Sequence, residues 1–339
     1  MKRRAVCVTM AAVMDKQNNP LNTKTGIRGS APFIELHLSR GVFATGGQLS
    51  GSVVFRLSRE TNIRALTVSV AGFETVAGAS FARAIRRQEP FFQREVLLSG
   101  REQPRFTSER ISQFWNGFLG RDVGRTLSAG EHMYPFAIPL PVSLPSSYEG
   151  KAGRIDYTVT ARVQFPIGSG VQVSTLVPVV FAPKGLKDRP VVLNYPGANG
   201  AGEQADLSIS VELPQRVVES GQRTSGHFII TNPHRTRIDA IDVLLESCEW
   251  VRESEQRELD RSVVESMTIE PDDPCAEVIK GSFSLRVPSD ALPTVEGTAI
   301  SVLWFLKLRL NSEPPLEFKT PITVYLPPWE ARRVTEPPI

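Results

Sequence analysis

Apolar and polar residues alternate along most of the chain, the pattern of strands that bury one face. In residues 154–163, every second side chain from Ile155 to Val163 is apolar or aromatic, and the residues between carry a charge or a hydroxyl. Such runs are rich in β-branched and aromatic residues and are bounded by Gly, Pro, Ser or Asn. The predicted strands are Phe33–Leu38, Gly51–Leu57, Ile63–Phe73, Phe91–Leu98, Tyr157–Phe165, Val171–Phe181, Asp206–Leu213, Gly226–Thr231, Ile238–Cys248, Val263–Ile269, Gly281–Val287, Ala299–Leu310 and Leu316–Tyr325. Helical periodicity is scarce, so the sequence predicts an all-β protein of antiparallel β-sandwiches.

The pattern also repeats. GQLSG at Gly47–Gly51 returns as GQRTSG at Gly221–Gly226, and counting on from the last glycine of each without a gap brings Glu74 onto Glu249. Later anchors are Phe136, Glu149-Gly150, Tyr157 and Val159, which match Phe283, Glu296-Gly297, Trp304 and Leu306. Two tandem copies of one sandwich are the simplest explanation. The predicted organisation is a flexible tail (1–30), a first sandwich (31–183), a linker (184–202), a second sandwich (203–326) and a short tail (327–339).

A proline-rich segment precedes the alternating strand of the first copy. Proline cannot donate a hydrogen bond to a strand ladder, so Pro139, Pro141 and Pro145 predict a sheet edge followed by a crossing loop. Phe136 is expected in the core and Glu149-Gly150 in a turn. This segment is therefore interpreted as scaffold.

One segment departs from the β pattern. Within Thr107–Gly120, apolar residues fall at helical spacing and predict one short amphipathic helix in the first domain. The apolar face consists of Ile111, Phe114, Trp115, Phe118 and Leu119. Two interpretations remain open: the helix packs on the sheet, or its Arg-flanked face binds a membrane or a protein partner.

Charge is unevenly distributed along the chain. Up to Pro183 there are 22 Lys+Arg and 12 Asp+Glu (+10), and the remainder has 17 and 24 (−7), which sum to the net charge of +3. A candidate site for an anionic partner is the loop with Arg83, Arg86 and Arg87, since paired guanidinium groups bind phosphate oxygens. The alternatives are an ordinary solvated loop and an arginine excess that reflects coding bias. Nucleic acid is disfavoured, because lysine is sparse and no aromatic-basic recognition motif occurs.

The sequence GEHMYPFAIPLPVSLPSSYEGKAGRIDY, Gly130–Tyr157, resembles a hallmark segment of the arrestin fold and is most similar to alpha-arrestins. Ile34–Leu36 and Gly47–Gly51 resemble the first strands of that family, and the weaker copy from Asp206 resembles its C-terminal domain. The resemblance spans about Phe33–Tyr325. It implies a non-enzymatic, cytoplasmic adaptor that links membrane-protein cargo tails to sorting or ubiquitination proteins at the plasma membrane or endosomes. Peripheral contact with acidic membrane is suggested separately by the basic excess up to Pro183.

The sequence departs from this family in two places. The basic phosphosensor of visual and beta-arrestins has no counterpart, because Val177 and Pro178 match its position. The Pro-Pro pairs continue as PPLE, PPWE and PPI, so none is the PPxY motif through which alpha-arrestins bind WW-domain ligases. Recruitment of a ligase by that route is therefore not supported. A constitutive arrestin-fold subunit of a retromer-like sorting complex remains an alternative.

Residues for catalysis or cofactor binding do not form a recognisable pattern. The four histidines are scattered, and Cys7, Cys248 and Cys275 have neither disulfide nor metal-ligand spacing. No nucleophile elbow or dinucleotide fingerprint occurs, so we expect no enzyme, no metal and no cofactor. No apolar run is long enough to cross a bilayer. The basic-then-apolar stretch Met1–Met14 has the outline of a secretory signal, which leaves a secreted β-sandwich protein as a less favoured alternative.

Overall fold

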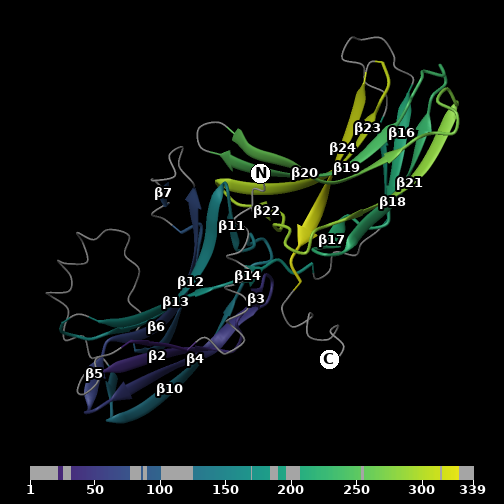
Figure 1. Ribbon diagram of the computed structural model, residues 1–339. Helices are drawn as coiled ribbons and strands as arrows, with labels where there is room; N and C mark the ends of the chain where they lie inside the picture. Colours follow the sequence, from purple (N-terminus) through teal and green to yellow (C-terminus); the bar gives the residue numbers. More distant parts are fainter. Residues whose placement is uncertain are drawn as a thin grey trace, which may run out of the picture. The chain divides into compact units, whose positions relative to one another are not determined.

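The computed structural model describes residues 22–25, 32–76, 85–86, 90–100, 125–168, 170–183, 190–195, 207–252, 256–313 and 315–327. All regular elements in these ranges are β-strands, which confirms the predicted all-β class (Figure 1). The predicted helix face Ile111–Leu119 lies outside the described residues and stays a prediction.

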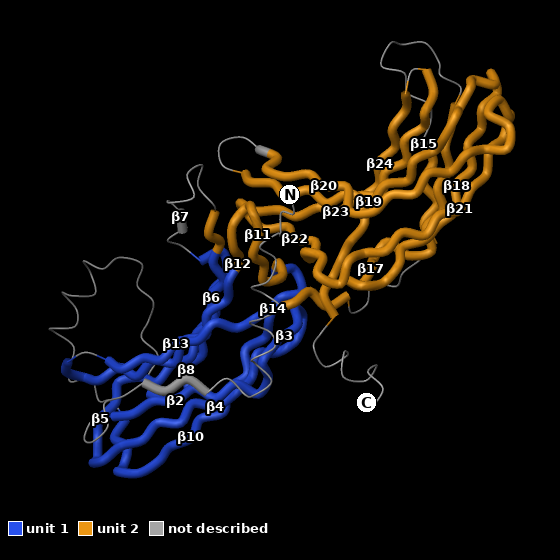
Figure 2. Tube along the Cα trace, viewed as in Figure 1, with its two compact units in different colours: residues 1–73, 87–144, 156–179 blue, residues 74–86, 145–155, 180–339 orange. Residues whose placement is uncertain are grey.

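The chain divides into two compact units, shown in blue and orange in Figure 2. Unit 1 comprises residues 1–73, 87–144 and 156–179; unit 2 comprises residues 74–86, 145–155 and 180–339. Unit 2 thus includes two short segments that the sequence repeat assigns to the first copy. Both segments contribute residues to the buried polar contacts described below.

The strands of the first repeat are β1 (Asn22–Thr25), β2 (Phe33–Leu38), β3 (Phe43–Ala44), β4 (Gln48–Leu57), β5 (Thr61–Ile63), β6 (Ala65–Val76), β7 (Ile85–Arg86), β8 (Phe92–Gly100), β9 (Arg125–Leu127), β10 (Gly130–Pro139), β11 (Tyr148–Gly150), β12 (Gly153–Gln164), β13 (Val171–Val177) and β14 (Val179–Val180). One sheet has the order β1-β2-β4-β10. A second has the order β11-β12-β6-β7, with β13 also paired to β12 and β8 to β6. Two short pairs, β14-β3 and β5-β9, complete the pairings.

The remaining strands are β15 (Val191–Tyr195), β16 (Ser208–Leu213), β17 (Val217–Glu219), β18 (Arg223–Thr231), β19 (Ile241–Arg252), β20 (Gln256–Ile269), β21 (Val278–Arg286), β22 (Val295–Glu296), β23 (Ile300–Leu310) and β24 (Leu316–Tyr325). They form a four-stranded sheet, β15-β16-β18-β21, and a larger sheet, β17-β24-β23-β19-β20, in which β22 also pairs with β23. The inward residues of both sheets are apolar and buried, which gives unit 2 a sandwich core.

Strand registers confirm the sequence repeat. Phe136 pairs with Gly51 across β10 and β4, and Phe283 pairs with Gly226 across β21 and β18. A Cβ placed on Gly51 would lie 3.0 Å from the ring of Phe136, and one on Gly226 would lie 2.7 Å from the ring of Phe283. Each copy therefore uses a glycine to make room for one buried phenylalanine.

The proline-rich segment has the predicted edge and crossing connection. Among the described strands, β10 stands at the edge of its sheet, pairs with β4 and ends at Pro139. Pro141 and Pro145 lie in the connection from β10 to β11. Phe136 is 6% exposed, as predicted for a core residue. Glu149-Gly150, predicted in a turn, instead end β11, and the turn to β12 follows at residues 151–152. No strand was predicted at Gly130–Pro139, where prolines mask the alternation; in β10, Phe136 and Ile138 are buried.

Candidate binding face

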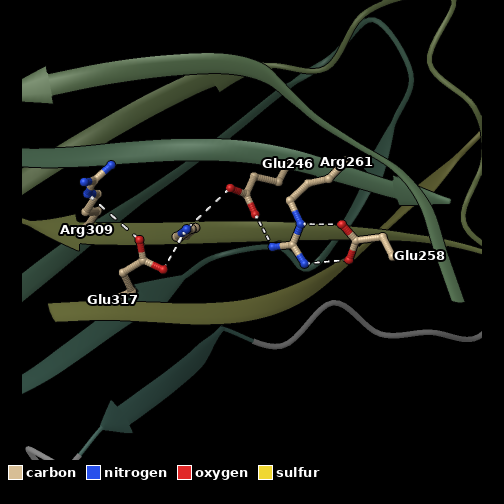
Figure 3. Close-up of polar contacts among 6 residues, drawn as sticks. Glu246, Glu258, Arg261, Arg309 and Glu317 are labelled. Atoms are coloured by element: carbon tan, nitrogen blue, oxygen red, sulfur yellow. Dashed lines mark hydrogen bonds and ion pairs between the residues drawn. The ribbon is translucent and has the colours of Figure 1, made fainter. Parts of the chain in front are cut away.

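Charged residues gather on the outward side of the larger sheet of unit 2. In β23, even-numbered residues from Ile300 to Leu310 are buried, so Lys307 and Arg309 point outward. With outward residues of three neighbouring strands they form what we call the paired-charge face (Figure 3). Its members are Glu246 from β19, Glu258 and Arg261 from β20, Lys307 and Arg309 from β23, and Glu317 from β24.

Glu246 lies at the centre of the paired-charge face and is only 3% exposed. One of its carboxylate oxygens lies 3.5 Å from Nη1 of Arg261, and the other lies 3.6 Å from Nζ of Lys307. A buried carboxylate without such partners would be costly, because both oxygens would lose water without replacement. Arg261 and Lys307, from neighbouring strands, therefore offset the cost of burying the Glu246 carboxylate.

Arg261 is further fixed by Glu258. Its Nη2 and Nε lie 2.7 Å and 2.9 Å from the two carboxylate oxygens of Glu258, which is a bidentate arrangement. The hydrogen bonds raise the pKa of Arg261 and lower the pKa of Glu258. Both groups are thus held in their charged forms.

Lys307 connects Glu246 to the next strand. Register places Lys307 directly opposite Lys319, and like charges in that position repel. The two ammonium groups avoid each other: Lys307 Nζ lies 2.8 Å from Glu317, and Lys319 Nζ lies 3.6 Å from the ring centroid of Phe305. The hydrogen bond from Lys307 lowers the pKa of Glu317. Arg309 adds a longer contact of 3.9 Å to the same carboxylate.

Cys248 lies buried beside this charged array. Burial raises the pKa of its thiol, and this outweighs the opposing influence of Arg261 and Lys319. A nucleophilic or metal-binding cysteine needs its thiolate form. Cys248 therefore contributes packing to this face and is not suited to covalent chemistry.

The geometry suits recognition of a protein surface better than capture of phosphate. The six members of the face are three acids and three bases, with the further cation Lys319 beside them over the ring of Phe305. The guanidinium of Arg261 is occupied by two carboxylates. A phosphate group would have to displace Glu258 from a bidentate contact. A partner with its own mixed polar surface could instead dock onto this fixed pattern of charges.

Unit 1 has a smaller version of the same arrangement. Glu35 of β2 is buried, and its oxygens lie 3.3 Å from Arg56 Nη1 and 2.9 Å from His37 Nε2. Arg56 also contacts Glu131 at 2.7 Å and lies over the ring of Phe33. The outward face of each unit thus contains a buried glutamate held by cationic or ring nitrogen groups.

The residues proposed from the sequence are mostly outside the described ranges. Arg83, Arg87 and the helix face Ile111–Leu119 lie there, and Arg86 is placed only by its backbone pairing with Thr75. The proposal that these residues bind an anionic or membrane partner stays a prediction. Sequence reasoning missed the paired-charge face, although the alternation WFLKLRL in β23 and LEFK in β24 is a visible signal once the two strands are placed in one hairpin.

Within the described part of the chain, no group of three or more His, Cys, Asp or Glu residues is placed to hold a metal ion. The same residues include no helix long and apolar enough to cross a membrane.

Family models match both copies of the repeat. The model of the arrestin (or S-antigen) N-terminal domain matches residues 33–180, and that of the arrestin C-terminal domain matches residues 203–329. The chain belongs to the arrestin family. The two matched regions of this arrestin-family chain also agree with two tandem β-sandwiches, as predicted.

Curated relatives of this arrestin-family chain are arrestin domain-containing proteins. Human arrestin domain-containing protein 1 is 29% identical over 164 residues, which cover 48% of this chain and 33% of that protein. The HECT-type ubiquitin ligase-interacting protein apyA of Emericella nidulans is 31% identical over 117 residues, 34% of this chain and 29% of that protein. Arrestin domain-containing protein 17 of Caenorhabditis elegans is 27% identical over 128 residues, 37% of this chain and 28% of that protein. The aligned regions span only about a third of these relatives.

Proposed function

We propose that this chain is a non-enzymatic adaptor that binds proteins and acts in the sorting or endocytosis of membrane proteins. The observation that carries the proposal is the pair of arrestin-domain matches at residues 33–180 and 203–329. Similarity to alpha-arrestins, one of which is named for its interaction with a HECT-type ubiquitin ligase, supports a role in linking other proteins.

The chemistry of the described residues favours binding over catalysis. The charged groups of the paired-charge face are neutralised by one another, and the buried thiol of Cys248 is kept protonated. Such a face offers shape and a fixed charge pattern, and it provides no activated nucleophile or base.

The proposed partners are cytoplasmic tails of membrane-protein cargo or proteins of a sorting complex, met at the plasma membrane or endosomes. A contact with acidic membrane through the basic residues of the first repeat is proposed in addition. The Pro-Pro pairs at 314–315 and 327–328 continue as PPLE and PPWE and lack the tyrosine of PPxY, so no contact with a ubiquitin ligase is proposed through these two segments.

Affinity purification of the full chain from its native cell, followed by identification of co-purified proteins, tests the proposal. We expect membrane proteins together with trafficking or ubiquitin-ligase components, in amounts that change with stimulus. Arg309→Glu is the informative variant, because Arg309 is half exposed on the paired-charge face and its ion pair with Glu317 is long, at 3.9 Å. If partners dock there, the variant recovers less of them at an unchanged melting temperature.

Two other outcomes would redirect the proposal. Recovery of the same partners in fixed stoichiometry under all conditions would favour a constitutive sorting-complex subunit. Recovery of no membrane or trafficking protein above a tagged control would refute the adaptor function.

A further inference from the structure

Two buried carboxylates in unit 2 take no part in the paired-charge face. Glu74, near the end of β6, is 1% exposed, and Glu249, near the end of β19, is 7% exposed. Both residues and all their hydrogen-bond donors described below belong to unit 2 (Figure 2). A buried carboxylate must accept several hydrogen bonds to offset the loss of water.

Glu74 accepts three hydrogen bonds from one turn of the second repeat. The backbone N–H groups of Thr298 and Ala299 donate to its two oxygens at 2.6 Å each, and the Thr298 hydroxyl donates at 2.9 Å. This turn connects β22 to β23. The carboxylate of one sequence repeat therefore holds a turn of the other.

Glu249 makes the converse contact. Its Oε2 accepts a hydrogen bond from the backbone N–H of Ala152 at 3.1 Å and another from the hydroxyl of Tyr148. Burial raises the pKa of Tyr148, so the phenol keeps the proton that it donates. Ala152 lies in the turn from β11 to β12, and Tyr148 begins β11. This turn is the first-repeat counterpart of the turn held by Glu74.

The sequence repeat makes the two contacts equivalent. Glu74 and Glu249 coincide in the repeat register, and Ala152 and Ala299 have the same spacing as the matched pair Tyr157 and Trp304. In both contacts the N–H of the equivalent alanine donates to the equivalent glutamate, and the alanine and the glutamate come from different repeats. Independent packing accidents would not produce this reciprocity.

The glycine of each repeated Glu-Gly dipeptide lies close to the buried glutamate of the other repeat. A Cβ on Gly150 would lie 2.8 Å from Oε2 of Glu249, and a Cβ on Gly297 would overlap Oε1 of Glu74. A larger residue at Gly297 would therefore push the Glu74 carboxylate away, and one at Gly150 would displace both the Tyr148 hydroxyl, which is nearer, and the Glu249 carboxylate that it contacts. The glycine in each turn is needed for close approach of the backbone to the glutamate of the other repeat.

We propose that Glu74 and Glu249 form a reciprocal pair of clasps, in which the carboxylate of each sequence repeat holds the hairpin connection of the other. These contacts add to the hydrogen bonds that each connection makes within its own repeat, from Gly297 N–H to the Ile300 carbonyl and from Ala152 N–H to the Tyr148 hydroxyl. The donors found for both carboxylates among the described residues are uncharged N–H and O–H groups, so each turn is held by hydrogen bonds to a carboxylate rather than by an ion pair. Loss of one carboxylate should be felt in the opposite repeat, at a turn distant in sequence.

Hydrogen exchange on the full chain, resolved to single amides, tests this proposal with Glu74→Gln and Glu249→Leu. Both oxygens of Glu74 accept hydrogen bonds, so glutamine, which keeps the shape but has a single oxygen, leaves a donor facing an –NH₂ group. In Glu74→Gln we expect the amide of Thr298 or that of Ala299 to exchange about tenfold faster, as expected when a hydrogen bond is lost. The amide of Ala152 should remain unchanged. Both donors to Glu249 meet its Oε2, an acceptor that glutamine can supply, so leucine is used there and should speed exchange at Ala152 while Thr298 and Ala299 stay unchanged.

Matched controls are available in the same turns. Glu149→Gln and Glu296→Gln change the exposed glutamates that precede Gly150 and Gly297 and should leave all three amides unchanged. If Glu74→Gln does not fold, Thr298→Val and Tyr148→Phe each remove one hydroxyl donor and should raise exchange only at the turn concerned. The proposal is overturned if Glu74→Gln accelerates exchange in β6 but not at Thr298 and Ala299, or if it behaves like Glu149→Gln.

Discussion

At the scale of single residues, the two repeats are best recognised by residues that need one another across strands. The phenylalanine of each copy lies over a glycine of the neighbouring strand, and the pairing is the same in both copies. A substitution of the phenylalanine or of the glycine removes a contact that has an equivalent in the other copy. Phe136 and Phe283 are therefore expected to be equivalent in energy as well as in position.

Phe136→Ala and Phe283→Ala should each lower the free energy of unfolding by about 3–5 kcal/mol, because each deletes a buried aromatic ring and leaves a cavity. Urea-induced unfolding of the full chain measures this loss. Glu149→Gln is the control, since its exposed side chain leaves the core unchanged. Similar losses in all three variants would mean that the segment around Phe136 has been misassigned.

At the scale of strands, the paired-charge face adds an electrostatic layer to the outward side of a sheet whose inward side is apolar. Glu317 links Lys307 and Arg309 and is held ionised by the hydrogen bond from Lys307. Its pKa lies below that of an unfolded glutamate, about 4.3. The folded chain therefore binds fewer protons at this group than the unfolded chain does, and the stability from the contact is present above that pH and is lost as pH falls.

Glu317→Gln should consequently be less stable than the unsubstituted protein at pH 7, and the difference should shrink as pH falls from 5 to 3. Melting temperatures measured over that range give the comparison, and Glu149→Gln shows the effect of removing an exposed glutamate. A difference that stays constant from pH 7 to pH 3 would contradict a stabilising, ionised Glu317.

Much of this element-level structure could be predicted from the sequence, and the failures have physical causes. Phe33–Leu38 and Leu316–Tyr325 were predicted with the observed bounds, because alternation and turn residues mark both ends. β20 begins at Gln256, seven residues before the predicted start, since an edge strand with charged residues lacks the apolar alternation. The hydrogen bonds of Glu74 and Glu249 could not be predicted from the sequence. The repeat shows that the two glutamates are equivalent, but it does not indicate which turn each of them contacts.

At the scale of the whole chain, the distribution of charge and the division into domains lead to separate predictions. Residues 190–195 of the predicted linker 184–202 are described, and Val191–Tyr195 form β15, which pairs with β16. The helix predicted at Ile111–Leu119 lies outside the described residues. Unit 2 takes two segments from the first repeat, so the sequence repeat and the compact units are different divisions of one chain. The basic excess up to Pro183 remains the main indication of an anionic partner.

Binding to anionic liposomes should weaken steeply between low and physiological salt, because exposed charge contacts are screened over about 8 Å at physiological ionic strength. The expected contribution is about 1 kcal/mol for each basic residue near the surface. Charge reversal at Arg83, Arg86 and Arg87 should reduce binding in a sedimentation assay and leave the melting temperature unchanged. Trp115→Ser separates the two interpretations of the predicted helix: reduced lipid binding means that its apolar face inserts, and a lowered melting temperature means that it packs on the sheet. Liposome binding that responds to neither salt nor the arginine reversals would leave the charge asymmetry without a membrane role, because a contact made by exposed cations must respond to both.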